Sequence, residues 1–261
     1  GIAHLDVSLH YANKPIARLK KFLLILVALL TIGYLLFSAV YFRSLARSKL
    51  CEAFEVVIED SSRTQFVRTS DIERLVKRYD LYPVGKSFGE INTLAIRDTI
   101  LGNQLVESAE VYTTPGGGIV AAIRQRKPVL RVISDHDGSF YVDQERRIMP
   151  VSTAFTVYVP VATGAVTETL AQGVLYDFAM FLNRNADWDA WIEQIEVRDN
   201  GDAVLIPRAG DFTIVMGSLE DYPVKLSKFA RFVDEGLNVV GWNRYSEINL
   251  KYENQVVCTR K

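Results

Sequence analysis

The chain has 261 residues and a formal net charge of −1, with 30 basic and 31 acidic residues. A phosphate-binding surface needs concentrated Lys and Arg, so this balance, without a basic stripe, argues against nucleic acid as the main partner. Hydrophobic residues make up 49% of the chain, which is enough for one large or two small folded domains.

The first predicted element is a membrane-spanning helix at residues 22–42. These 21 positions contain no charged residue and no proline. At about 1.5 Å per helical residue the run reaches about 31 Å, close to the thickness of the hydrocarbon core of a bilayer. The run is apolar on every face, which disfavours a core helix of a soluble protein. Basic residues flank it on both sides: Lys14, Arg18, Lys20 and Lys21 before it, and Arg43, Arg47 and Lys49 after it.

A cleaved secretory signal peptide is the competing interpretation of this segment. Signal peptides have an apolar core of roughly 7 to 15 residues that ends at a small-x-small motif. Here the run is longer, and the candidate motif at 44–46 follows the bulky Tyr41 and Phe42. The segment is therefore predicted to be an uncleaved anchor behind a tail at residues 1–21. Four basic residues before the run against three after it favour a cytoplasmic N-terminus and an exported C-terminal region.

Behind the anchor the pattern predicts one strand and two helices. The strand covers residues 54–59. Ser70 followed by Glu73 has the spacing of a capping box, which predicts that a helix starts at Ser70. A second helix at 91–101 is predicted to end at Gly102, a natural C-terminal capping residue. The first helix has apolar residues at helical spacing, and a proline and a glycine close it: Ile72, Leu75, Val76 and Tyr79, then Pro83 and Gly85.

Two strands at 106–113 and 119–126 complete the first unit, which is predicted to cover residues 50–130. The sequence Thr-Pro-Gly-Gly-Gly at 114–118 joins them. A phosphate-binding loop would continue with Gly-Lys-Ser/Thr and a helix, whereas a strand follows here. A hairpin turn is therefore predicted, and the unit has the order strand, helix, helix, strand, strand.

A second unit is predicted at residues 131–261, with short strands, flanking helices and mainly antiparallel pairing. The fold class is therefore α+β. The spacing of Trp188 and Trp191 is typical of core aromatic residues, with a sugar platform as the alternative. The other predicted features are strands at 140–143 and 147–150, a helical face of Leu170, Val174, Phe178 and Phe181, a hairpin at Asn200-Gly201, a strand at 212–216, a helix from Pro223 to Gly236, and strands at 247–252 and 255–259.

Residues suited to catalysis or metal binding are few. His136 is the one histidine beyond the anchor, and Asp-His-Asp-Gly at 135–138 has the composition of a hairpin turn. Neither Cys nor His has the spacing of zinc ligands, and no carboxylate pair stands out. Cys51 and Cys258 are predicted to be free thiols, because a disulfide would require both ends of the exported region to meet. No catalytic, cofactor or metal site is predicted, and a membrane-anchored cell-wall hydrolase remains an alternative.

Four segments of the chain match short motifs: residues 106–111 match "V..A.V", 125–130 match "E..P.A", 141–143 match "lvD..G", and 249–252 match "D.RY". Together with the order of the elements, these segments resemble the FtsQ/DivIB family of bacterial cell-division proteins over nearly the whole chain. Gln125 and Leu130 depart from the family's usual Glu and small residue, and Asn249 and Lys251 replace its Asp and Arg.

The resemblance implies a bitopic scaffold of the divisome in the bacterial inner membrane, without enzymatic activity and involved in septation. It implies a cytoplasmic N-terminus, one membrane helix surrounded by lipid, a POTRA domain and a C-terminal β-domain outside the cytoplasm. The implied partners are FtsB-like and FtsL-like coiled-coil proteins and other divisome proteins. A POTRA-containing secretion or assembly component is a further alternative, although such proteins typically carry repeated POTRA units and a membrane β-barrel.

The last predicted strand is the candidate partner-binding site. The edge of a sheet has unpaired N–H and C=O groups that accept a strand from another chain. The competing interpretation is that these residues only complete the β-domain. Lys251 and Tyr252 match the family's basic-aromatic pair by position, and the predicted site adds Gln255, Val256, Val257 and Cys258.

Overall fold

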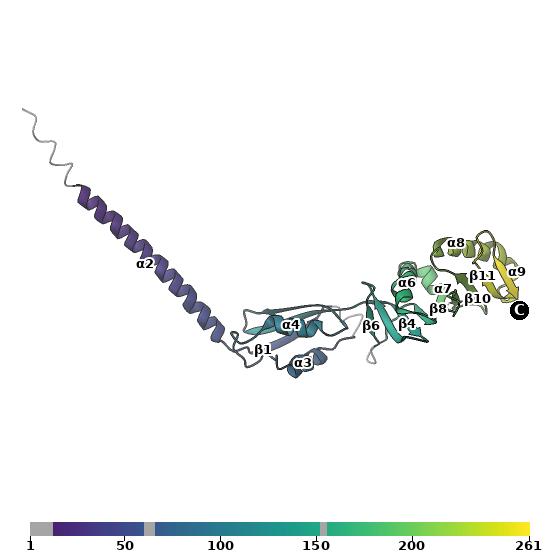
Figure 1. Cartoon of the computed structure of the whole chain (residues 1–261), viewed down its shortest axis with the longest axis horizontal. Helices are drawn as coiled ribbons and strands as arrows, with labels where there is room; N and C mark the ends of the chain where they lie inside the picture. The colour runs from purple at the N-terminus through teal and green to yellow at the C-terminus, as the bar shows by residue number, and fades with distance from the viewer. Residues whose placement is uncertain (1–12, 60–65, 152–155) are drawn as a thin grey trace, which may run out of the picture.

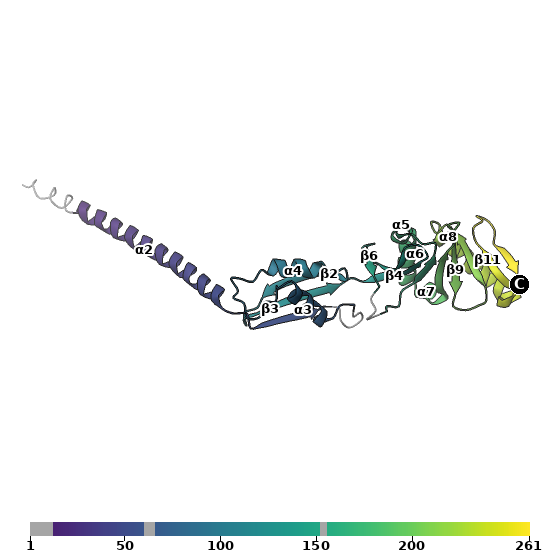
Figure 2. The same ribbon diagram turned by 60° about the horizontal axis from the view of Figure 1, so that its bottom comes forward.

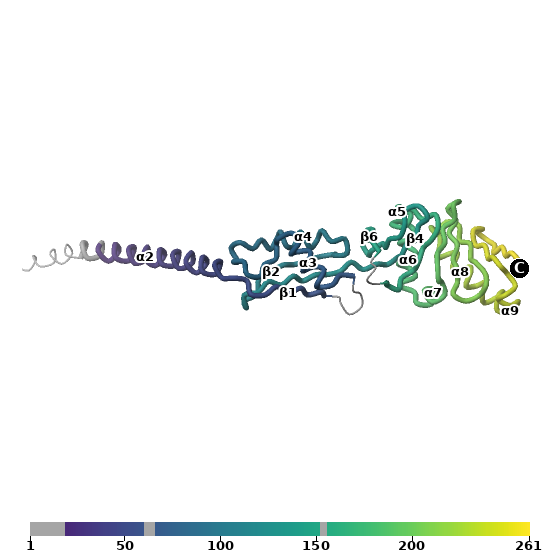
Figure 3. The backbone as a smooth tube through the Cα atoms, turned by 90° about the horizontal axis from the view of Figure 1, so that it is seen from below, coloured from purple at the N-terminus to yellow at the C-terminus, as the bar shows by residue number. Residues whose placement is uncertain are grey.

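The structure, a computed structural model, describes residues 13–59, 66–151 and 156–261. The molecule is elongated: helix α2 (Asn13–Ser48) leads into a small three-stranded unit, and a nine-stranded unit follows, with the C-terminus at the far end (Figure 1). The turned views in Figure 2 and Figure 3 show the same order along the long axis. Within the described residues one helix, Leu19–Ser48, is long and apolar enough to cross a membrane, and none of its apolar window is buried against protein.

The first unit is a three-stranded sheet covered on one face by two helices. Its strand order is β1-β3-β2, with β3 parallel to β1 and antiparallel to β2, so the predicted hairpin is confirmed. Ile72 and Val76 from one helix and Ile96 and Ile100 from the other are fully buried against the sheet. The elements are β1 (Ala53–Ile58), α3 (Thr69–Arg78), α4 (Thr93–Leu101), β2 (Val106–Thr113) and β3 (Gly118–Gln125).

Both ends of α3 differ from the prediction. The helix begins at Thr69 with Arg68 as its N-cap, so Ser70 lies inside the helix and the predicted capping box is wrong. The helix stops at Arg78, before the predicted breakers, because Asp80 adopts a left-handed backbone with φ +55°. The N–H of Leu81 then donates to the carbonyl of Val76 at 3.0 Å, which satisfies an end carbonyl in a Schellman motif.

The second unit contains a nine-stranded sheet in the order β12-β11-β10-β9-β8-β7-β4-β5-β6. The sheet is mostly antiparallel, as predicted, and its parallel pairs are β4–β7, β7–β8 and β10–β11. The Asn200-Gly201 hairpin joins β8 and β9 as predicted. The strands are β4 (Pro128–Ser134), β5 (Gly138–Asp143), β6 (Ile148–Pro150), β7 (Val161–Gly164), β8 (Ile192–Val197), β9 (Ala203–Pro207), β10 (Thr213–Gly217), β11 (Tyr245–Asn249) and β12 (Val257–Arg260).

Two helical predictions in this unit need correction. The helical face predicted around Leu170 is divided at Gly173, whose backbone (φ −97°, ψ −118°) is not helical. Gly236 does not end the next helix, because the helical backbone continues through a π-helical turn (Val233–Leu237). The helical conformation ends at Gly241, which has φ +94°. The helices are α5 (Glu168–Gln172), α6 (Val174–Arg184), α7 (Ala186–Trp191), α8 (Tyr222–Phe232), α9 (Asn238–Val240) and a 3₁₀ turn (Trp242–Arg244).

The two units each have a hydrophobic cluster, and two residues of the large sheet lie in the cluster of the first unit. Tyr141 on β5 and Met149 on β6 belong to the large sheet, yet both are fully buried in the hydrophobic cluster of the first unit. The ring of Phe66 meets the ring of Tyr141 edge to face, with 6.0 Å between their centroids. The β5–β6 hairpin therefore joins the units by apolar packing as well as by the chain itself.

Candidate partner-docking edge

Strand β12 forms one edge of the large sheet, as predicted for the last strand. In the described part of the chain it pairs with β11 alone, from Tyr245↔Arg260 to Asn249↔Val257. A strand with one neighbour presents every second N–H and C=O outward, where another strand can pair with them. The edge therefore has the backbone chemistry that β-strand addition requires.

The side chains before and along β12 alternate between the core and solvent. Val256 and Cys258 are partly buried against the large hydrophobic core, whereas Val257 is exposed. Burial raises the pKa of the Cys258 thiol, so it is a packing group rather than a reactive thiolate. Of the predicted site residues on or beside this strand, Val257 is the one that presents a large apolar surface to an incoming chain.

The predicted residues ahead of β12 lie in the turn that follows β11. Tyr252 is 50% exposed there, and Gln255 is also exposed. Lys228 on α8 holds this turn, because its ammonium donates to the carbonyl of Leu250 at 3.0 Å and to the carbonyl of Tyr252. Desolvation, assisted by the nearby Lys225, lowers the pKa of Lys228. The position of Tyr252 thus depends on a lysine from a different element.

Lys251 has an internal partner. Its ammonium donates to both carboxylate oxygens of Asp202, at 2.9 and 2.8 Å, and this contact holds the pKa of Asp202 below its usual range. The side chain crosses β10 at Gly217, where an added Cβ would lie 2.7 Å from the Lys251 Cγ. The structure therefore does not place the Lys251 ammonium on the free edge of β12, and it gives this residue a role within the unit.

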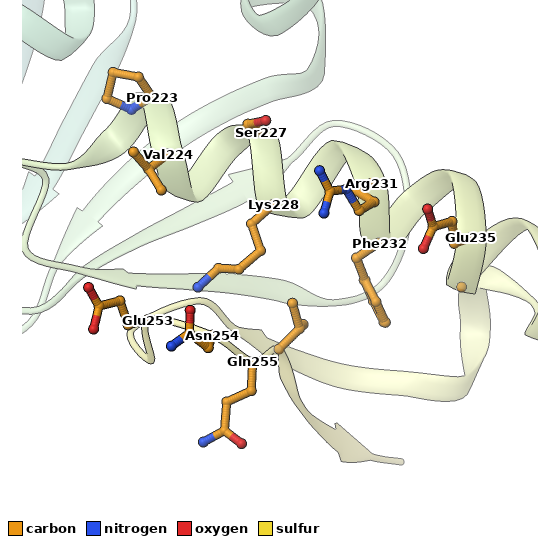
Figure 4. A pocket seen from close by; sticks show the side chains of 12 residues that line it. Pro223, Val224, Ser227, Lys228, Arg231, Phe232, Glu235, Glu253, Asn254 and Gln255 are labelled. Carbon is orange, nitrogen blue, oxygen red and sulfur yellow. The ribbon is translucent and has the colours of Figure 1, made fainter.

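A groove of about 840 Å³ runs between α8 and the turn at 253–256, next to β12. Figure 4 shows the Lys228 side chain reaching from the helix toward Glu253 and Asn254. Lys228, Arg231 and Glu235 line the helical side at i, i+3 and i+7. The sequence prediction did not include the polar face of α8, because it used only the apolar residues at helical spacing, such as the buried Leu226 and Phe229. The polar residues beside them also follow helical spacing and could have been found in the same way.

The other predicted features have structural roles. Ser134 Oγ accepts the N–H groups of His136 and Asp137, at 3.1 and 3.0 Å, in the tight turn that joins β4 to β5, so the hairpin prediction is confirmed. Trp188 and Trp191 are partly buried against the large core, as predicted, and contact the Phe229 ring.

In the described part of the chain, no group of three or more His, Cys, Asp or Glu side chains could hold a metal ion. Cys51 is buried and its thiol donates to the carbonyl of Ala53 at 3.2 Å, and both cysteines are free. Within these residues, the edge and its groove are the best candidate for a functional surface.

Comparison with protein families gives one match for each unit. The POTRA-like domain family matches residues 49–124, which contain β1, α3, α4, β2 and nearly all of β3. The family described as FtsQ/DivIB, C-terminal related, matches residues 127–259, slightly more than half of the 261-residue chain. No curated protein matches the chain. With a POTRA-like unit followed by the matched sheet that ends in β12, the chain belongs to the FtsQ/DivIB family of bacterial cell-division proteins.

Proposed function

We propose that the protein is a bitopic scaffold of the divisome that captures an FtsB-like and FtsL-like pair at the β12 edge. Membership in the FtsQ/DivIB family implies a role in cell division and contacts with other division proteins. The observation that carries the finer proposal is the position of β12, which has one neighbouring strand and an adjacent groove. This surface suits a protein that assembles others, because backbone groups provide affinity and alternate side chains provide selectivity.

In this proposal the partner adds one extended segment to β12. Val257 faces that segment, Tyr252 contacts its flank, and the turn at 253–256 directs the rest of the partner toward the groove. The partly buried Val256 and Cys258 support the strand from beneath, and Gln255 lies at its start. Lys251 acts mainly by fixing the turn through Asp202.

The proposed topology places residues 1–21 in the cytoplasm and 22–42 across the inner membrane. A POTRA domain at 50–130 and a β-domain at 131–261 then lie outside the cytoplasm. The long exposed apolar helix supports a membrane location. The family is one of non-enzymatic division scaffolds, so the proposed work of the chain is assembly rather than catalysis.

The full-length double variant Tyr252→Asp with Val257→Lys tests the edge. It places one charge at the turn and one on the outward face of β12, so partner capture should fall by more than tenfold, as expected when a central contact is lost. Capture of a purified FtsB-like and FtsL-like pair by the protein in detergent is the measurement.

A matched variant, Tyr79→Asp with Val239→Lys, makes the same chemical changes at exposed sites on other elements and should capture the pair normally. Circular dichroism and thermal unfolding establish that both variants fold. Unchanged capture by the folded edge variant would refute the proposal, as would an equal loss in both variants.

A further inference from the structure

A pocket of about 730 Å³ lies where the end of α2 meets the turn between β2 and β3. Among the described residues that line it, Arg43, Arg47 and Lys49 contribute basic side chains and Glu52 the one carboxylate. Thr113 and Thr114, on and beside the end of β2, line the opposite wall. We refer to these residues as the juxtamembrane pocket. The end of α2 lies at the opposite end of the two folded units from β12 (Figure 1).

The basic side chains of the pocket are not neutralised within the described chain. Arg43, Arg47 and Lys49 are exposed and form no ion pair with any described residue, whereas many other surface cations do. Three cations against one carboxylate leave an excess of positive charge. Arginine binds phosphate oxygens through paired N–H groups, which makes this composition suitable for a phosphate group.

Backbone hydrogen bonds fix the helix end against the first unit. The N–H of Gly89 donates to the Arg47 carbonyl at 2.9 Å, and the N–H of Phe88 donates to the Lys49 carbonyl at 3.0 Å. On the hairpin side, the N–H of Glu52 donates to the Gly117 carbonyl at 2.9 Å. The two walls of the pocket come from distant parts of the chain but are held together, so the cations have a defined location.

The apolar run sets the depth of the pocket. It ends at Phe42, and Arg43 follows directly. Arg47 lies four residues further, which is about 6 Å along a helix. The polar headgroup layer on each side of a bilayer is about 5 to 8 Å thick. With residues 22–42 in the hydrocarbon core, the two arginines lie at headgroup depth.

We propose that the juxtamembrane pocket binds the phosphate of an anionic phospholipid in the leaflet where α2 leaves the membrane. The inference rests on the membrane-spanning helix of the proposed function, and it is independent of β12. The proposal also gives a role to the basic residues after the helix. Those residues reduce the difference in basic charge between the two ends of the helix, from which its orientation in the membrane is predicted. The bound lipid would hold the first unit at a fixed angle to the membrane surface.

The experiment uses full-length protein in nanodiscs that contain both phosphatidylcholine and phosphatidylglycerol. A small amount of spin-labelled phosphatidylcholine or spin-labelled phosphatidylglycerol is added to the discs, and electron spin resonance gives the fraction of each labelled lipid that the protein immobilises. The wild type should prefer phosphatidylglycerol. The triple variant Arg43→Gln, Arg47→Gln and Lys49→Gln should lose this preference by about tenfold or more, because each basic residue near the surface contributes to anionic lipid binding.

A matched triple variant, Arg74→Gln, Arg78→Gln and Arg97→Gln, removes the same charge from α3 and α4 and should keep the wild-type preference. Equal loss in both variants would overturn the pocket in favour of general charge attraction, and no preference in the wild type would also overturn it. Inorganic phosphate is added as a competitor. Displacement of the lipid at concentrations near the lipid's own would assign the pocket to free phosphate and overturn the proposal.

Two further measurements separate this inference from the proposed function. Resistance of the protein in native membranes to carbonate extraction reports membrane insertion, and capture of the partner pair by the protein in nanodiscs reports the β12 edge. Lost lipid preference with normal capture in the triple variant supports a separate pocket. An inserted wild type that captures the pair but shows no lipid preference overturns the pocket alone. Release by carbonate would overturn both proposals.

Discussion

At the scale of single residues, Lys251 and Arg146 show that a local sequence pattern does not predict the long-range contacts of a side chain. The basic-aromatic pattern marks Lys251 as a partner contact, but the pattern contains no information about Asp202, 49 positions earlier, which binds its ammonium. Arg146 lies where the "lvD..G" pattern has glycine, and it adopts the left-handed backbone that glycine favours, with φ +61°. Its side chain binds Asp177 at 2.5 Å and covers the Tyr176 ring at 4.1 Å. These contacts come from α6 and are not visible in the local sequence.

The Lys251–Asp202 pair predicts a pH-dependent stability. Lys251→Met should lower the free energy of unfolding by about 0.5 kcal/mol at pH 7, since the pair is partly exposed and screened by solvent. Because the folded-state pKa of Asp202 is lowered, its contribution is present above the ordinary aspartate pKa of about 3.9 and is lost as the pH falls through the lowered value. Urea denaturation at neutral and acidic pH measures the difference.

The variant Asp202→Asn removes the other member of the pair and should lower the free energy of unfolding at pH 7 by the same amount. Combining Asp202→Asn with Lys251→Met should cause little further loss. A deficit in Lys251→Met that persists unchanged in acid would assign the effect to packing of its methylene groups on Gly217.

At the scale of elements, the hairpins were easier to predict than the helix ends. Local turn residues set the hairpins, and Asn200-Gly201 is sufficient to predict one. The ends of α3 and the break at Gly173 depend on backbone conformations that tertiary contacts select. The edge position of β12 followed from its place in the chain, but the groove beside it depends on how α8 packs.

Gly164 gives a prediction at this scale. It has φ +88° and ends β7, and an added Cβ would lie 2.3 Å from the Val197 carbonyl oxygen of β8. Gly164→Ala therefore combines backbone strain with a collision and should lower the free energy of unfolding by about 3 kcal/mol or more. Equilibrium denaturation followed by tryptophan fluorescence measures this, since Trp188, Trp191 and Trp242 all lie in this unit.

Gly201→Ala is the control, because it has φ +82° but open space around the added Cβ, and it should cost about 1 kcal/mol. Equal effects of the two alanines would show that the approach of β8 to Gly164 is not a constraint.

At the scale of the whole molecule, the sequence predicted two units but not how they join. The predicted boundary at 130/131 falls within β4, and it remains a prediction. The large sheet places β4 between β5 and β7, an order set by parallel crossovers whose register no local pattern specifies. The burial of Tyr141 and Met149 in the other unit's core was likewise not predictable, because both read as ordinary strand residues.

Met149→Ala tests this contact between the units. Removing a fully buried side chain should lower the free energy of unfolding by about 2 to 4 kcal/mol. The loss should loosen the first unit, although β6 belongs to the second. The rate of thiol labelling at the buried Cys51, followed by peptide mass spectrometry, reports opening of the first unit, and tryptophan fluorescence reports the second.

Leu205→Ala, which truncates a fully buried residue of the larger cluster, should act mainly on the tryptophan signal. If Met149→Ala left Cys51 labelling at the wild-type rate, the two units would be energetically separate.

The elongated shape has a consequence for partner choice. Helix α2 and strand β12 lie at opposite ends of the long axis, with both folded units between them (Figure 1). In the proposed topology, with the long axis directed away from the membrane, a partner anchored in the same bilayer would reach the β12 edge only if its own stalk were about as long as the two units together. A coiled-coil stalk provides such a span at about 1.5 Å per residue and with little bending. The molecule would thus sort candidate partners by height above the membrane before any side chain is compared.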